Sequence, residues 1–300
     1  MKTQVKSMIL LLLTAIIWGF AFVAQRTGGQ YVGTFTYNGI RFCLGTLSLI
    51  PVILIFEREK RDPAKWKRTL FAALLCGVIL FIASTLQQIG VNITQSAGKG
   101  GFITGLYTVL VPIIGFLFLK RKVGWNAWLG AFLAVIGLFL LSINLEEGET
   151  FFGWGELVLL IGSVFWAMHI IVIDRFVESI SPLKFAMGQF FVCAVLSMLG
   201  AVLTEEFVWS NILSAGPSIL YGGLMSVGVA YTLQILGQKD AEPTIAAIVL
   251  STESMFSAIG GILILGETLP GRGYFGCVLI FAGIILSQLV LKKKTTAQKS

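Results

Sequence analysis

The feature that most constrains the fold is a series of long apolar runs that contain almost no charge. A helix needs about 20 apolar residues to cross the hydrocarbon core of a bilayer. Ten runs of this kind follow one another, at residues 7–26, 34–56, 69–89, 96–119, 124–144, 155–174, 183–203, 212–236, 243–265 and 271–291. Only 12% of the residues are charged, against about a quarter in a soluble protein. We therefore predict an all-α integral membrane protein with ten transmembrane helices.

Lys and Arg are distributed unevenly between these runs, and this indicates an orientation, since cytoplasmic loops carry the excess. With the N-terminus in the cytoplasm, the external loops hold only Arg26 and Arg272, while Arg41 and Lys99 fall inside runs. The rest of the 22 Lys and Arg residues lie in cytoplasmic segments. An odd number of spans would place Lys292–Lys294 outside. We predict a multi-pass protein of the plasma membrane with both termini in the cytoplasm.

The chain also contains an internal repeat. Residues recur at separations of 146 or 148, and the matched positions are Gly130 with Gly276, Gly137 with Gly283, Trp18 with Trp166, and Arg41-Phe42 with Gln189-Phe190. Ten spans divide into two copies of five, which we place at 1–146 and 147–300. Because five is odd, the two copies are predicted to have opposite orientations. Such inverted repeats are typical of secondary transporters, which bind substrate near the midplane between the copies.

The first run, preceded by Lys2 and Lys6, also has features of a secretory signal peptide. No small-residue cleavage site follows it, however. Its removal would also delete Trp18, the partner of Trp166 in the repeat. We therefore interpret the first run as a membrane span.

Several other classes of protein are disfavoured by the residues present. The four cysteines lie inside apolar runs, at spacings that fit neither a disulfide framework nor a zinc site. The sequence has no phosphate-binding Gly-x-x-x-x-Gly-Lys-Ser/Thr loop and no metal-ligand cluster. The net charge of +7 follows the membrane orientation rather than marking a nucleic-acid surface. We expect no cofactor, no metal and no nucleic-acid partner.

Short motifs occur in a characteristic order along the ten runs, namely Ile17-Trp18-Gly19-Phe20, Arg41-Phe42, Thr94-Gln95-Ser96-Ala97, Trp166, Gln189 and Gly260–Glu267. In this order the chain resembles the EamA family of the drug/metabolite transporter superfamily over essentially its whole length. The resemblance implies two inverted five-helix repeats that carry small polar metabolites, often amino acids and often outward. The chain differs from the family pattern at Lys120-Arg121-Lys122, where the family often has Gly-Glu. It keeps the Gly-Glu motif at Gly266-Glu267.

Three charged residues lie more than two positions inside the ends of the predicted spans, where an ionisable group is costly and commonly functional. Glu253 lies near the middle of its run and is a candidate for proton coupling or for binding a substrate ammonium, although a structural carboxyl is an alternative. Arg41 is a candidate for a charge pair with Glu253 or for binding a substrate carboxylate. Alternatively, the Arg41 side chain extends toward the outer membrane interface. For Lys99 we favour this second interpretation.

Uncharged polar and aromatic residues complete the candidate site. Trp18 and Trp166 lie near the middle of their spans, where each indole N–H needs a partner, so they are candidates for opposite walls of a cavity. His169 is one turn beyond Trp166 and is either a relay or a structural hydrogen-bond partner. Pro112 is expected to kink the fourth span. The predicted substrate-binding residues are Trp18, Tyr107, Trp166, His169, Tyr231, Gln234 and Glu253.

The sequence thus favours an exporter or facilitator of small polar metabolites that works by alternating access. Two alternatives are a membrane-embedded enzyme with Glu253 and His169 as acid and base, and a scaffold without a transport cycle. The expected partners are a small-molecule substrate, the lipid bilayer and a proton, in a monomer or homodimer. The fifth and tenth spans contain small residues at intervals of seven and no ionisable group between their ends, so we expect them to be scaffold or dimer contacts that pair closely.

Overall fold

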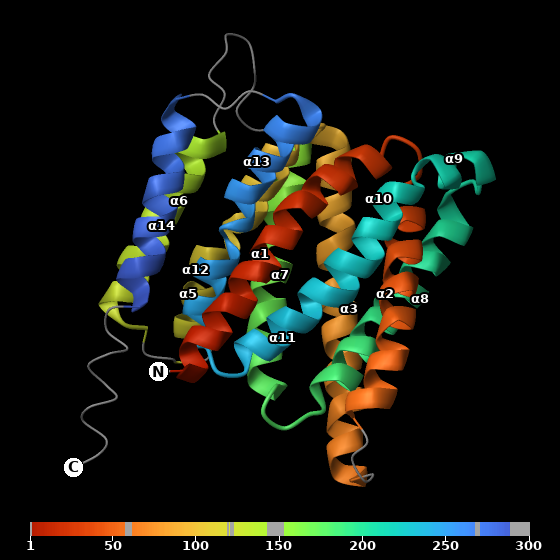
Figure 1. The fold of residues 1–300 in the computed structure, drawn as a ribbon, viewed down its shortest axis with the longest axis horizontal. Coiled ribbons are helices and arrows are strands. Elements are labelled where there is room, and N and C mark those ends of the chain that lie inside the picture. Colours follow the sequence, from red (N-terminus) through yellow and green to blue (C-terminus); the bar gives the residue numbers. More distant parts are fainter. Residues whose placement is uncertain are drawn as a thin grey trace.

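The computed structural model describes residues 2–57, 62–118, 120, 123–142, 153–267 and 271–288, and all regular elements in these ranges are helices (Figure 1). The first half contains α1 (Lys2–Gly28), α2 (Thr34–Phe56), α3 (Pro63–Thr94), α4 (Ala97–Gly105), α5 (Tyr107–Leu117) and α6 (Trp125–Ser142). The second contains α7 (Trp154–Phe176), α8 (Pro182–Thr204), α9 (Trp209–Ser214), α10 (Gly216–Leu220), η1 (Tyr221–Tyr231), α11 (Thr232–Gln238), α12 (Pro243–Leu250), α13 (Glu253–Leu265) and α14 (Gly271–Gln288).

Eight helical stretches in the described residues are long and apolar enough to cross a membrane. They are Thr3–Gly28, Thr34–Phe56, Pro63–Thr94, Ala97–Leu117, Trp154–Phe176, Pro182–Thr204, Gly216–Gln238 and Pro243–Leu265. The two other predicted spans correspond to α6 and α14, which are apolar but shorter. The prediction of an all-helical membrane protein is therefore confirmed in the described part of the chain.

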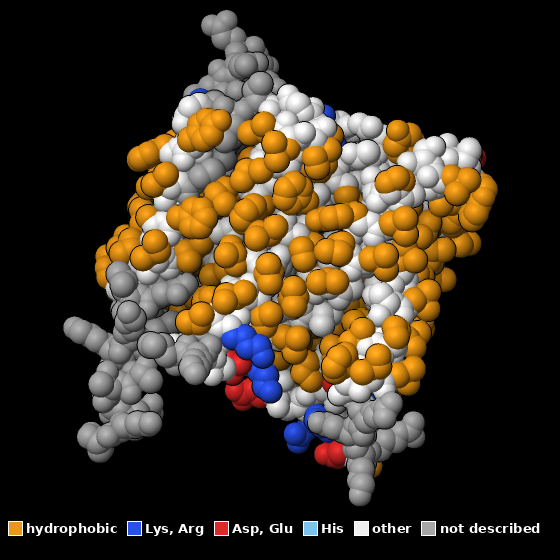
Figure 2. Space-filling model, in the orientation of Figure 1, with side chains coloured by type: hydrophobic (Ala, Val, Ile, Leu, Met, Phe, Trp, Pro, Cys, Tyr) orange, Lys and Arg blue, Asp and Glu red, His pale blue; other side chains and the backbone are white. Residues whose placement is uncertain are grey.

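The outside of the helix bundle is apolar, and much of its polar content is buried. Figure 2 shows hydrophobic side chains across the face of the bundle and charged ones gathered near one edge. Leu203 and Leu263 are 81% and 73% exposed, whereas the side chains of Gln88 and Gln189 are completely buried. This distribution suits a lipid environment, in which apolar surface is solvated and polar groups must find partners inside the protein.

Two of the membrane helices are interrupted at corresponding places in the two halves. Between α4 and α5 the backbone tightens at Leu106, whose N–H donates to the carbonyl of Ile103 at 3.2 Å. Between α12 and α13 the N–H of Thr252 donates to the carbonyl of Val249, also at 3.2 Å. The residues that begin the second segments are Tyr107 and Glu253, which are 146 positions apart.

The sequence predicts a kink at Pro112 in the fourth span, but the interruption of this span is at another residue. Pro112 lies within α5, whereas the change of helix occurs earlier, at Leu106. Gly105, next to the change, packs so closely that an added Cβ would lie 2.8 Å from the Ser254 hydroxyl of α13. The interruption therefore coincides with a contact between the halves rather than with the proline.

The span that ends at Gln238 contains an 11-residue π-helical segment, η1, where the sequence predicted an ordinary helix. A side chain at Gly223 of η1 would place its Cβ 2.6 Å from Leu44 Cβ and 3.0 Å from the Arg41 carbonyl, both of α2. This close approach sets η1 tightly against α2. Long π-helical geometry is rare and is found mostly at functional sites, and η1 supplies part of the cavity described below.

Close packing of α6 against α14 confirms the pairing that the small residues predicted. A Cβ added at Gly137 of α6 would lie 2.5 Å from the Gly276 carbonyl oxygen of α14. One added at Gly283 of α14 would lie 2.6 Å from the Gly130 carbonyl oxygen. The two helices lie side by side at one end of the bundle (Figure 1), and the other helices surround the polar interior.

Candidate functional site

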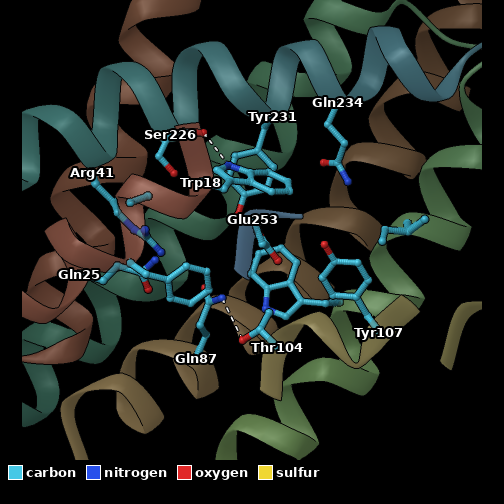
Figure 3. A pocket seen from close by; sticks show the side chains of 14 residues that line it. Trp18, Gln25, Arg41, Gln87, Thr104, Tyr107, Ser226, Tyr231, Gln234 and Glu253 are labelled. Carbon is cyan, nitrogen blue, oxygen red and sulfur yellow. Dashed lines mark hydrogen bonds between the residues drawn. The ribbon is translucent and has the colours of Figure 1, made fainter. Parts of the chain in front are cut away.

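A cavity lies between the two halves of the chain, with about 410 Å³ of empty space when the part that is open to the outside is counted. Both halves supply its walls, from α1 through α5 on one side and from α7, η1, α11 and α13 on the other. Figure 3 shows the polar and aromatic side chains that point into it. The lining residues are Trp18, Ala21, Phe22, Gln25, Arg41, Gln87, Thr104, Tyr107, Trp166, Ile170, Ser226, Tyr231, Gln234 and Glu253.

Arg41 brings a positive charge to this cavity from α2. Its side chain is only 2% exposed, so it does not extend to the outer interface. The guanidinium carbon lies 5.3 Å from the ring centroid of Tyr37 and 5.0 Å from that of Phe42, within cation–π range. Its Nε and Nη2 atoms are buried without a hydrogen-bond partner. Among the described residues, no carboxylate forms an ion pair with Arg41.

Glu253 brings a negative charge from the other half. It is the first residue of α13 and only 3% exposed, so its carboxyl group lies at a helix N-terminus inside the protein. A helix N-terminus favours negative charge because its backbone N–H groups are directed there. The interruption before α13 therefore has a local consequence, since it places a helix N-terminus beside the cavity.

The hydroxyl groups that flank Glu253 are used within the protein. Ser254 and Ser257 donate to the carbonyl oxygens of Gly101 and Ala97 in α4. The hydroxyl groups of Ser251 and Thr252 bond to carbonyls of their own helix, at 2.8 and 2.7 Å. Ser254 and Ser257 thus attach α13 to α4, which leaves Glu253 as the member of this polar segment that lines the cavity.

Three aromatic residues form one wall. The ring centroids of Trp18 and Tyr231 are 4.6 Å apart, and Trp166 stacks on Tyr231 at 6.1 Å. The two tryptophans lie 6.2 Å apart, so they form adjoining parts of one aromatic cluster rather than opposite walls. The Trp18 indole N–H donates to the Ser226 carbonyl at 3.2 Å, whereas the Trp166 indole nitrogen is buried without a partner.

Two predicted candidates lie away from the lining. His169 is completely buried, and its Nε2 lies 3.0 Å from the Gln189 Oε1 atom. The centroid of its ring is 6.0 Å from that of Tyr231, so it adjoins the aromatic cluster without being part of the lining. Lys99 forms an ion pair with Glu156 at 3.8 Å. The remaining candidates, Tyr107, Gln234 and the residues above, all line the cavity.

The cavity also contains polar residues that the sequence did not single out, namely Gln25, Thr104 and Ser226. Gln25 lies two turns after Trp18 on the same face of α1, which is a signal that the sequence carries. Thr104 accepts a hydrogen bond from the Gln87 amide at 3.3 Å, a contact between α4 and α3. Ser226 enters through η1, whose π-helical form had no signal in the sequence.

Comparison with known proteins agrees with this arrangement. The model of the EamA-like transporter family matches the chain twice, at residues 5–143 and 153–289. An uncharacterized transporter of Archaeoglobus fulgidus is 29% identical over 279 residues, which cover 93% of this chain and 84% of that protein. The threonine/homoserine exporter RhtA of Salmonella typhimurium is 26% identical, over 88% of this chain and 84% of the exporter.

A solved crystal structure shares the fold. It aligns with a TM-score of 0.76 and 19% sequence identity over 96% of this chain and 98% of its own. At that identity the likeness concerns the fold alone. The two family matches together cover most of the sequence, one in each half. The two similar proteins described above are named as transporters. The chain is a multi-pass membrane protein that belongs to the EamA-like transporter family.

Proposed function

We propose that this protein is a secondary transporter, an exporter or facilitator, of small polar metabolites such as amino acids, and that it works by alternating access between its two halves. The observation that carries the proposal is the cavity between the halves, which contains the buried charges of Arg41 and Glu253. Such polar sites near the midplane, at the interface of repeats, are where secondary transporters bind substrate. The relative named as a threonine/homoserine exporter supports an amino acid as the cargo.

We further propose ten spans, with α6 and α14 as the fifth and tenth, in two inverted halves at 1–146 and 147–300. Three observations support this arrangement. The family model matches once in each half. The interruptions at Leu106 and Thr252 occupy corresponding positions. In Figure 1, α1 begins and α14 ends at the same edge of the molecule, as an even number of spans requires.

The same scheme places the protein in the plasma membrane with both termini in the cytoplasm. Its support is the distribution of Lys and Arg in the sequence. Lys292–Lys294, on which the sequence argument partly relies, lie outside the described residues. A monomer and a homodimer are both compatible with the scheme.

An enzymatic role receives less support from the geometry. The acid–base pair considered from the sequence was Glu253 with His169. Glu253 lines the cavity, but the Nε2 atom of His169 is engaged with Gln189 and the residue is not part of the lining. The relatives are named as transporters. We therefore propose a transporter that is not an enzyme, with a proton as the coupling ion and Glu253 as its carrier.

Flux measurements in proteoliposomes test the proposal. Purified protein is reconstituted, and the uptake of a panel of radiolabelled amino acids, organic amines, organic acids and nucleobases is measured with and without a pH gradient. We expect saturable, competable uptake of at least one small polar compound above that of protein-free vesicles. Uptake that never saturates for any member of the panel would contradict a carrier and favour a scaffold.

A further inference from the structure

The charges of the cavity indicate the chemical class of the substrate. Burial of an unpaired charge is costly, and in a membrane such groups are usually functional. Arg41 is nearly inaccessible, and two of its nitrogen atoms are aimed into the protein without a partner. The faces of Tyr37 and Phe42 stabilise the cation but leave the Nε and Nη2 groups without an acceptor. The part of the cavity beside Arg41 therefore suits a group that accepts hydrogen bonds and carries negative charge.

Glu253 presents the opposite charge in the same cavity. Figure 3 shows both side chains directed into it, Arg41 from the α2 side and Glu253 from α13. The two residues do not form an ion pair with each other in the described structure. A pair of opposite charges that do not neutralise one another creates a local field that orients a dipolar molecule.

The repeat makes this field directional. Arg41 corresponds in the second half to Gln189, which is neutral, bonded to His169 and outside the lining. Glu253 corresponds in the first half to Tyr107, which does line the cavity. The cationic and anionic positions are therefore each present once, on different halves, so that a substrate with two different charged ends has one preferred orientation.

Resting on the transport function proposed above, we propose that the substrate is a small zwitterion whose carboxylate binds Arg41 and whose ammonium group binds Glu253. A guanidinium offers a carboxylate two parallel hydrogen bonds, which is the strongest pairing available to it. A dicarboxylate would place negative charge beside Glu253, and a diamine would place positive charge beside Arg41. The cavity thus discriminates against both classes, because each would place one of its charges beside a protein charge of the same sign.

The test compares an amino acid that the wild-type protein transports with its decarboxylated amine and its 2-hydroxy acid. We expect the wild type to transport the amino acid with an apparent KM at least tenfold lower than that of either analogue. In Arg41→Gln, which copies the residue at the matched position of the repeat, we expect the KM for the amino acid to rise at least tenfold. The amine, which has no carboxylate, should be affected less than twofold.

Two controls keep the result interpretable. Arg41→Lys retains the charge but not the bidentate geometry, and it should recover part of the lost affinity. Binding of the amino acid to detergent-solubilised protein, measured by thermal shift, reports recognition even if a variant no longer completes the cycle. Equal losses for the amino acid and the amine, or an unchanged KM in Arg41→Gln, would overturn the zwitterion proposal. Absence of flux in the wild type would instead overturn the transport function.

A second and independent observation concerns the ends of α2 and α8. The carboxylate of Glu205, just beyond α8, accepts hydrogen bonds from the N–H groups of Phe35 and Thr36 at the start of α2, both at 2.8 Å. The carboxylate of Glu57, just beyond α2, accepts one from the N–H of Leu183 at the start of α8, at 3.3 Å, with the Lys184 ammonium 3.8 Å away. We call these two contacts the α2–α8 clasps.

The clasps are related by the repeat. Glu57 and Glu205 are 148 positions apart, and so are Phe35 and Leu183. Each carboxylate occupies the N-terminus of the partner helix, where negative charge is favoured and free backbone N–H groups need acceptors. Since each helix caps the other, the pair is joined at both ends, and both clasps are closed in one conformation. If the two clasps were gates that open in turn during the transport cycle, one of them would be open in this conformation.

We infer that α2 and α8 form a fixed pair that stays joined at both ends during the transport cycle, while other helices move. The test uses a background in which all four cysteines are replaced by alanine. Phe35→Cys with Glu205→Cys, and Glu57→Cys with Leu183→Cys, are combined and joined by a short bis-methanethiosulfonate, which links two thiols through disulfides that a reductant cleaves. We expect flux within twofold of the unjoined protein. A loss of more than tenfold that a reductant restores would show that a clasp must open.

Hydrogen–deuterium exchange on the wild-type protein gives a second measurement that needs no substitution. The amides of residues 34–36 and 183–184 are compared with and without saturating substrate. Equal protection of both segments in the two conditions is expected for a fixed pair. Faster exchange at either segment when substrate is added would overturn the inference, and this result would not depend on whether the cysteine variants fold.

Discussion

At the scale of single residues, the polar segment around Glu253 divides its roles between side chains. Ser254 and Ser257 bind the backbone of α4, so they join helices. Glu253, next to them, lines the cavity, so it is available to substrate or proton. Residues that are neighbours in sequence thus lie separately in a helix contact and in the cavity lining, because a helix turns successive side chains toward different partners.

We predict that Glu253→Gln abolishes the dependence of transport on a pH gradient. Glutamine keeps the size of the side chain but cannot exchange a proton in this range. The measurement is uptake in proteoliposomes with and without an imposed gradient. Glu156→Gln is the matched control, since Glu156 pairs with Lys99 outside the cavity, and it should retain the dependence. Uptake by Glu253→Gln that still follows the gradient would remove Glu253 as the coupling group.

We also predict that Ser254→Ala with Ser257→Ala lowers stability without changing which substrates are recognised. Each hydroxyl bonds a carbonyl of another helix, and such bonds in membrane proteins contribute about 0.6–2 kcal/mol. Thermal unfolding in detergent should show a lower midpoint for the double variant. Ser251→Ala serves as the control, because its hydroxyl bonds within its own helix at 2.8 Å. An equal shift in both variants would contradict the role assigned to Ser254 and Ser257.

At the scale of elements, the closeness of helix pairs is set by small residues. Lipid solvates apolar surface well, so helices gain little from burying leucine and associate through close packing instead. The α6–α14 pair shows this at Gly137 and Gly283, where each backbone meets a carbonyl of the other helix. Neither helix contributes to the cavity lining. The pair therefore supports the bundle from one end, apart from the site.

Gly137→Ala is predicted to destabilise the protein by about 1–3 kcal/mol, the usual cost of overpacking. The new Cβ would lie 2.5 Å from the Gly276 carbonyl oxygen, so the two helices would have to separate. Gly115→Ala in α5 is the matched control, because a Cβ there meets nothing within 4 Å. Alanine should be neutral or favourable at that position through its helix propensity. Thermal unfolding followed by size-exclusion chromatography compares the two, and equal midpoints would refute the close contact.

At the scale of the whole molecule, two halves meet around a polar cavity, and the outer face is apolar (Figure 2). Contacts between the halves occur inside the bundle and at the helix ends. Ser254 joins α13 to α4, the α2–α8 clasps join the ends of those helices, and Arg26 pairs with Glu267. A change in access to the cavity would require some of these contacts to separate while others hold, which is the expectation for two bodies moving about a shared site.

The proposed orientation predicts that both termini face the cytoplasm. Fusions of green fluorescent protein at the C-terminus should be fluorescent in bacteria, and alkaline phosphatase fusions there should be inactive. A phosphatase inserted after Glu147, in the loop assigned to the outside, should be active and serves as the control. An active phosphatase at the C-terminus would contradict an even number of spans.

Much of the site was predictable because burial of polar groups in a membrane is costly wherever it occurs. That cost identified Arg41 and Glu253 from their positions within apolar runs, and the repeat identified Trp18 and Trp166. The same reasoning also selected His169 and Lys99, whose polar groups interact with protein side chains outside the cavity lining. The position of a polar group deep in a membrane span indicates that the group needs a partner, but it does not indicate whether the partner is the substrate or another part of the protein.

The sequence by itself determined the membrane class, the internal repeat and the small-residue pairing of α6 with α14, because these depend on local hydrophobicity and spacing. Only the tertiary structure decided which polar residues share the cavity, where the helices are interrupted and that η1 is π-helical. Those features result from contacts between segments far apart in the chain, such as Gly105 with Ser254 and Gly223 with Leu44. A periodic pattern specifies which face of a helix is polar, whereas packing specifies what that face meets.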